Sequence, residues 1–174
     1  MTVLLSKYVQ VPIEQSSEWE KVADVADRLV EHLNTKSALQ KINEVNQPGR
    51  SSHDVQDTFL RFAEQLGFES EKKGLFAQAE LALRPDYYME LPGSGILLEV
   101  ERGKTTINNM DLLDFWKCHL CNRAHYLFLL VPQALRQNEK MTPRNEYAIV
   151  LRRLSHFFSE ENYTNVRGLC VFGY

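Results

Sequence analysis

The chain has 174 residues, of which 44% are hydrophobic and 25% are charged. These values are typical of one globular domain with a buried core and exclude a low-complexity or fibrous chain. The net charge of -3 gives no overall basic field of the kind that marks many nucleic-acid binders. The N-terminus lacks the pattern of an export signal, and no apolar run approaches the ~18 residues of a membrane span. We therefore expect a cytoplasmic protein without a membrane segment, and the three cysteines fit a reducing compartment.

The first third of the chain shows helical periodicity. In residues 16–34, apolar side chains recur at spacings of three and four behind a capping serine, which predicts an amphipathic helix. A second, short helix is predicted over 37–45, and the segment 46–52 interrupts it. A third helix follows and ends at Gly67. We therefore expect the N-terminal third to be helical.

The middle of the chain changes to strand-like segments separated by glycine, proline or charged residues. The predicted strands are 68–71, 75–83, 87–91 and 96–101. After them, residues 110–122 have the spacing of a largely buried helix, whose apolar residues are Leu112, Leu113, Phe115, Trp116 and Leu120.

The last part of the chain predicts two strands and a helix. Residues 126–131 form a continuous apolar run, which is typical of a strand covered on both faces. A helix is predicted over 146–158, and a final strand over 168–173. This order of helices and strands predicts an α/β (α+β) protein with a central mixed β-sheet flanked by α-helices.

Two acids lie in an otherwise apolar strand. Because side chains on a strand alternate between its faces, Glu99 and Glu101 project from the same side, roughly 6 to 7 Å apart at ~3.3 Å per residue. Such a pair needs solvent, basic partners or a cation. Solvent at a wet sheet edge is the simpler interpretation.

A third acid favours the cation. Asp86 follows Pro85, and the turn at 92–95 suits a hairpin that would bring Asp86 beside Glu99. Three hard oxygen donors would then converge, and Mg²⁺ or Mn²⁺ takes such ligands. The sequence therefore predicts a divalent metal site at these residues.

Pro85-Asp86, followed by the strand 96-ILLEVE-101, resembles the signature of the PD-(D/E)XK nuclease superfamily. The resemblance extends over residues 52–131 and implies a restriction-endonuclease-like core. We expect a single domain over 1–174, with a helical N-terminal extension (1–50), a nuclease-like core (51–131) and a C-terminal helix and strand (132–174). Glu101 stands where most members have lysine, and some type II restriction endonucleases carry Glu-x-Glu here.

The resemblance implies roles for particular residues. Asp86 and Glu99 would be metal ligands, together with the Val100 carbonyl and Glu101. Glu101 would also orient or deprotonate the attacking water. In the superfamily the first core helix often contributes an acid to the site, some ten residues before an end like Gly67-Phe68, and counting back makes Gln56 an auxiliary candidate.

Basic residues must supply the charge that the acids lack. Lys104 and Lys117 are candidates for a displaced catalytic lysine, and Arg102 for a phosphate contact. Since acids alone cannot attract a polyanion, a DNA-binding surface needs further cations. Those nearest in sequence to the motif are Arg50, Arg84, Arg102, Lys104, Lys117 and Arg123.

The first interpretation is a Mg²⁺- or Mn²⁺-dependent endonuclease that hydrolyses DNA phosphodiester bonds. Cutting both strands with one site per chain favours a homodimer. The second is a catalytically inactive nuclease-fold module that binds nucleic acid or serves in assembly. The third is a zinc-stabilised interaction domain, which would use Cys118, Cys121 and His125 at helical spacing. Zinc needs a fourth ligand, from His119 or Cys170, and packed cysteines are the simpler interpretation.

Overall fold

A computed structural model describes residues 2–71, 76, 83–103, 105–136, 140 and 142–174. Its helices are α1 (Ser17–Leu33), α2 (Lys36–Val45), α3 (Ser52–Leu66), α4 (Met110–Leu120) and α5 (Glu146–Leu154), with 3-10 turns at Val11–Ile13 and Ser155–Phe158. Its strands are β1 (Leu4–Val9), β2 (Glu69–Ser70), β3 (Tyr87–Leu91), β4 (Ser94–Val100), β5 (Tyr126–Val131) and β6 (Gly168–Gly173). Among the described residues, no helix is both long and apolar enough to cross a membrane.

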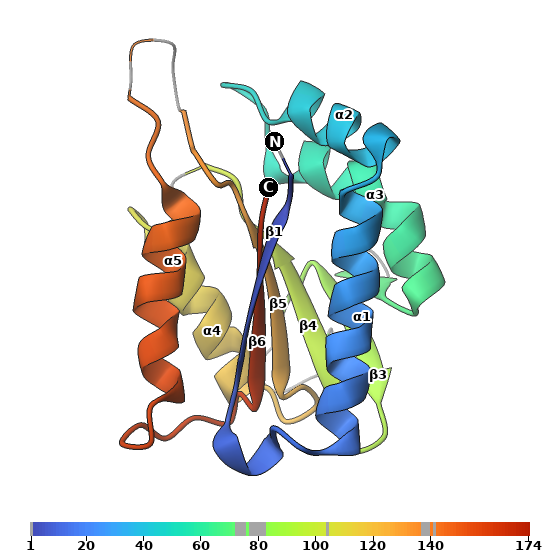
Figure 1. The fold of residues 1–174 in the computed structure, drawn as a ribbon, viewed down its shortest axis with the longest axis vertical. Coiled ribbons are helices and arrows are strands. Elements are labelled where there is room, and N and C mark those ends of the chain that lie inside the picture. The colour runs from blue at the N-terminus through green and yellow to red at the C-terminus, as the bar shows by residue number, and fades with distance from the viewer. Residues whose placement is uncertain (1, 72–75, 77–82, 104, 137–139, 141) are drawn as a thin grey trace.

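The strands form one six-stranded mixed sheet in the order β1-β6-β5-β4-β3-β2. The central strands β4, β5 and β6 run parallel, and the outer strands β1, β3 and β2 pair antiparallel to their neighbours. Figure 1 shows α4 and α5 on one side of this sheet and α1, α2 and α3 on the other. The predicted fold class, a mixed sheet flanked by helices, is confirmed.

The two faces of β4 bury different sets of side chains. Ile96, Leu98 and Val100 belong to the core under α1, α2 and α3. Leu97 belongs to the second core, which packs under α4 and α5. Because side chains alternate along a strand, Glu99 projects toward the α4 face, as does Leu97. This places an acid, 3% exposed, inside the molecule.

Three expectations need correction or lie outside the described residues. The N-terminal third is not purely helical, because β1 pairs with β6 along its whole length and forms an edge of the sheet. β1 is half exposed and alternates weakly, so its sequence carries little strand signal. The helix predicted over 146–158 ends at Leu154 and continues as a 3-10 turn. The strand predicted over 75–83 lies mostly outside the described residues; Phe76, which is described, is in a turn.

Local signals explain why the elements around β4 begin and end where they do. Ser51 and Asp54 form a reciprocal capping box at the start of α3, and Gly67 ends that helix in the left-handed conformation, with φ 105°. Gly93, with φ 75°, occupies the tight turn between β3 and β4. The turn therefore sets the register of the hairpin that carries Asp86 and Glu99.

Candidate active site

The β3–β4 hairpin brings Asp86 against Glu99. Tyr87 pairs with Leu98 in the hairpin, so Asp86 and Glu99 lie opposite one another just beyond that pair. The backbone N–H of Asp86 donates to Glu99 Oε2 at 3.2 Å. The N–H of Val100 donates to Asp86 Oδ2 at 2.7 Å. Both carboxyls are thus held by the backbone at the C-terminal end of β4.

Helix α4 brings a lysine and a further acid to the same place. Lys117 Nζ lies 2.7 Å from Glu99 Oε1 and 3.1 Å from Asp114 Oδ1. The same ammonium donates to the carbonyl oxygen of Arg84 at 3.4 Å. The structure therefore brings a predicted lysine onto a predicted metal ligand, and it adds Asp114.

Asp114 was missed because the buried side of α4 was assigned incorrectly. Leu113, Trp116 and Leu120, expected in the core, are each about half exposed. The buried side instead contains Asp111, Asp114, Phe115 and Cys118, at helical spacings of three and four. The spacing of three between Asp114 and Lys117 was the available signal.

We call Asp86, Glu99, Glu101 and Asp114 the acid cluster. Burial, and next the negative charge of Asp114, raises the pKa of Glu99 well above its usual value. Burial likewise raises the pKa of Asp86 and of Asp114. For Glu101, burial and the neighbouring Asp114 and Asp86 raise the pKa to about 8. The acid cluster therefore favours protons or another source of positive charge.

Lys117 meets part of that demand. Burial lowers its pKa, but Glu99 and Asp114 together raise it above the usual value for lysine. Lys117 forms ion pairs with Glu99 and with Asp114. Asp86 and Glu101 form no ion pair within the described residues. Negative charge thus exceeds positive charge in the contacts that the structure describes.

Gln56 lies at the edge of the acid cluster, on α3. Its side chain is buried and interacts with Asp86, which lowers the pKa of that carboxyl. Its Nε2 nevertheless has no partner with hydrogen-bond geometry among the described residues. The predicted auxiliary residue therefore lies beside the acid cluster with a free donor.

The other predicted basic residues differ in their availability. The guanidinium of Arg102 donates to the backbone carbonyls of Gln47 and Arg50, so it fastens the segment before α3 to the end of β4. Arg84 is exposed beside Asp86. The guanidinium of Arg123 lies over the Tyr88 ring, 5.2 Å from its centroid. Lys104 lies outside the described residues.

The segment that leads into α4 is fastened to α5. Glu146 Oε2 accepts from the backbone N–H of Thr106 at 3.1 Å. Arg153 donates to the Thr106 carbonyl at 3.0 Å and lies 3.4 Å from Asp111 Oδ2. Since Asp111 and Glu146 are fully buried, these contacts fix where α4 begins.

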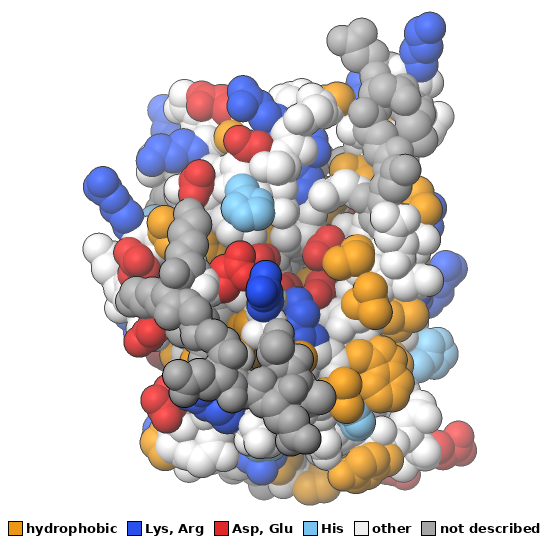
Figure 2. Space-filling model, turned by 180° about the vertical axis from the view of Figure 1, so that it is seen from behind, with side chains coloured by type: hydrophobic (Ala, Val, Ile, Leu, Met, Phe, Trp, Pro, Cys, Tyr) orange, Lys and Arg blue, Asp and Glu red, His pale blue; other side chains and the backbone are white. Residues whose placement is uncertain are grey.

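Figure 2 shows acidic and basic side chains gathered near the middle of one face of the molecule. The exposed apolar side chains of α4, Leu113, Trp116 and Leu120, lie on that helix's outer side.

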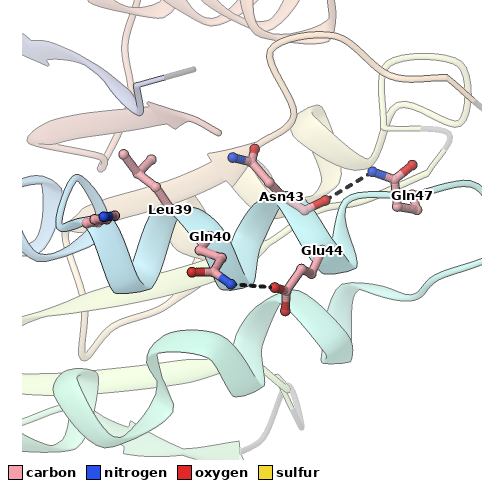
Figure 3. Close-up of a pocket in the computed structure, with 6 residues that line it drawn as sticks. Leu39, Gln40, Asn43, Glu44 and Gln47 are labelled. Carbon is pink, nitrogen blue, oxygen red and sulfur yellow. Dashed lines mark hydrogen bonds between the residues drawn. The ribbon is translucent and has the colours of Figure 1, made fainter.

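A separate hollow on α2 contains none of the acid cluster. Figure 3 shows Gln40 paired with Glu44 along that helix, and the distance between Gln40 Nε2 and Glu44 Oε1 is 3.0 Å. It is lined by Lys36, Leu39, Gln40, Asn43, Glu44 and Gln47.

The donor types of the acid cluster suit a hard divalent cation, because they are carboxylate and carbonyl oxygens. Asp114 Oδ2 is buried and has no hydrogen-bond partner among the described residues. Among the residues that the structure describes, however, no three His, Cys, Asp or Glu side chains surround a common metal position. The residues thus suit a divalent cation by donor type, while Lys117 occupies Glu99 Oε1 and Asp114 Oδ1.

The predicted zinc ligands are also not assembled. Cys118 and Cys121 are buried in the α4 core. His125 Nδ1 lies 2.9 Å from the Ser94 hydroxyl. Cys118, Cys121 and His125 are described residues, and they belong to no group of three side chains that could hold a metal ion. Packing of the two cysteines in the core therefore explains their spacing.

Comparison with known proteins gives a distant likeness to a solved structure and no match by sequence. No family model matches the chain, and no curated protein matches it by sequence. Among solved structures, the chain is similar to the restriction endonuclease BglII in complex with a DNA 16-mer. The match has 8% sequence identity and a TM-score of 0.42, and it covers 99% of this chain and 78% of that one. We therefore base the functional proposal on this chain's own residues.

Proposed function

We propose that the chain is a cation-dependent endonuclease that hydrolyses DNA phosphodiester bonds at the acid cluster. The observation that carries the proposal is the meeting of Asp86, Glu99 and Lys117 at one end of β4. The backbone N–H of Asp86 lies 3.2 Å from Glu99 Oε2, and Lys117 Nζ lies 2.7 Å from Glu99 Oε1. Carboxylates beside a lysine, at the end of a hairpin, provide both ligands for Mg²⁺ or Mn²⁺ and a positive charge for a phosphate.

Each residue has a role in this proposal. Asp86, Glu99 and the Val100 carbonyl would hold the cation, which when bound lowers the pKa of a water molecule and neutralises phosphate charge. With the positive charge of the cation beside it, Glu101 would ionise and take a proton from the attacking water, and Lys117 would stabilise charge on the phosphate. Asp114 orients Lys117, and Gln56 orients Asp86. Arg84 is placed to contact the DNA backbone.

The test is cleavage of supercoiled plasmid DNA with Mg²⁺ or Mn²⁺. We expect nicking or linearisation that EDTA abolishes, and a loss of about 100-fold or more in Asp86→Asn and Glu99→Gln. The matched controls are Asp57→Asn on α3 and Glu90→Gln on β3, since both side chains are exposed. Both controls should cleave as wild type does.

Two results would reject the proposal. One is full cleavage by the Glu99→Gln variant, which would place the activity elsewhere or in a contaminant. The other is a folded wild type that is inactive on supercoiled, linear and single-stranded DNA with either cation. That second result would favour an inactive nucleic-acid-binding or assembly module, in which Glu101 marks the loss of the usual lysine.

A further inference from the structure

Lys117 lies in a set of oxygens that resembles a cation site more than a single ion pair. Its three N–H groups face Glu99 Oε1 at 2.7 Å, Asp114 Oδ1 at 3.1 Å and the Arg84 carbonyl at 3.4 Å. We call these three oxygens the oxygen cradle. Its oxygens come from the end of β4, from α4 and from the segment before β3.

The donors of the oxygen cradle are of the kind that a hard divalent cation takes. Their spacing is set for an ammonium, because Mg²⁺ needs oxygens at about 2.0 to 2.1 Å and the cradle oxygens lie at 2.7 Å and beyond. The cradle contains two carboxylates and one backbone carbonyl, and among the described residues no three His, Cys, Asp or Glu side chains surround one metal position. An ammonium and a divalent ion cannot both use Glu99 Oε1 from the same point.

From this geometry we propose that Lys117 is the resident cation of the metal-free acid cluster, and that divalent ions bind by displacing its ammonium from Glu99. The inference rests on the proposed function in one respect, the identity of Glu99 as a metal ligand. Lys117 therefore lowers the affinity of the site for the cation. Once released from Glu99 and Asp114, the ammonium is free to face a phosphate oxygen.

Burial makes this competition strong. Glu99 and Asp114 are 3% and 1% exposed, so neither carboxylate can exchange Lys117 for bulk water at low cost. Asp114 Oδ2, which has no hydrogen-bond partner among the described residues, is a further oxygen close to the exchange. The acid cluster therefore exchanges the Lys117 ammonium for a divalent ion and always holds one of the two.

The experiment measures Mn²⁺ affinity of the whole chain without DNA, from the electron paramagnetic resonance signal of free Mn²⁺. In Lys117→Met and Lys117→Gln, the affinity should rise about tenfold or more, a conservative value for removing a like charge a few ångströms away. Arg84→Met is the matched control, because it removes an exposed neighbouring charge but keeps the carbonyl that Lys117 contacts. Its affinity should change less than about threefold, since exposed charges are screened.

A second measurement covers the case in which Lys117→Met does not fold. Metal-free Lys117→Gln should melt below wild type, because Glu99 and Asp114 lose their partner, and saturating Mn²⁺ should raise its melting temperature more than that of wild type. Equal affinity gains in the Arg84 and Lys117 variants, or unchanged or weaker binding in both Lys117 variants, would overturn the inference.

The inference and the proposed function fail separately. If wild type cleaves DNA through Glu99 but the Lys117 variants gain no affinity, the proposed function stands and Lys117 does not compete with the cation. If the Lys117 variants gain affinity but wild type cuts no DNA, the competition stands and the proposed function is wrong.

Discussion

At the scale of single residues, the acid cluster is stabilised by its local hydrogen bonds and destabilised by its own charge. Backbone N–H groups bind Asp86 and Glu99, and Lys117 pairs with Glu99 and Asp114. These contacts leave Glu101 without an ion pair in the described part of the chain. Its pKa of about 8 means that folding takes up a proton at neutral pH.

The raised pKa of Glu101 predicts how stability depends on pH. The unfolded chain loses this proton near pH 4.5, the ordinary value, whereas the folded chain keeps it until about pH 8. Between these values the folded state binds more protons, so stability must fall as pH rises, by at most about 1.4 kcal/mol per pH unit. Urea unfolding at pH 5, 6, 7 and 8 should show a shallower decline in Glu101→Gln than in wild type.

The exposed Glu90 provides the control for this pH series. Glu90→Gln should follow the wild-type decline, because its side chain is solvated in both states. Parallel curves for wild type and Glu101→Gln would mean that Glu101 is ionised in the folded protein, contrary to its position beside Asp114 and Asp86.

The sequence predicted part of this site and could not predict the rest. Asp86, Glu99 and Glu101 follow from a proline, a hairpin turn and strand alternation, which are local signals. Lys117 was one of two candidate lysines, since chain spacing does not say which helix packs on which strand. To predict Asp114 as part of the site, one must know that α4 buries its acids and exposes Leu113. Tertiary packing alone decides this orientation.

At the scale of elements, α4 is positioned by contacts with α5. Glu146 binds the Thr106 N–H, and Arg153 binds both the Thr106 carbonyl and Asp111. Since Lys117 lies two turns after the start of α4, a shift at Asp111 would move the ammonium relative to Glu99. The contacts with α5 therefore support the acid cluster from a distance.

Removal of Arg153 tests this support. In Arg153→Met, Asp111 becomes a fully buried acid without its ion pair, so the free energy of unfolding in urea should fall by about 3 kcal/mol or more. The adjacent, exposed Arg152→Met should change it by less than about 0.5 kcal/mol. Equal, small losses in both variants would show that Arg153 does not hold the start of α4.

Element prediction succeeded where periodicity was strong. The three N-terminal helices and strands β3, β5 and β6 were predicted close to their observed bounds. The helices have a clear period and a capping residue or breaker, and β5 is a continuous apolar run. β1 was missed because an edge strand with one partner is partly exposed on both faces and alternates weakly.

At the scale of the whole molecule, the sheet brings distant segments to one end of β4. The register of β3 with β4 supplies Asp86, and the crossover from β4 through α4 to β5 supplies Asp114 and Lys117. Net charge is -3, so the proposed binding of DNA would depend on local cations such as Arg84 and on the proposed metal ion.

The most direct test of the central claim is a crystal structure of the wild-type chain soaked in saturating Mn²⁺, with anomalous scattering used to locate the metal. We predict an anomalous peak at the acid cluster, about 2.1 to 2.2 Å from oxygens of Asp86 and Glu99, with the Lys117 ammonium moved away from Glu99. Crystals in which Lys117 still bridges Glu99 and Asp114, and in which no peak lies at the acid cluster, would contradict it.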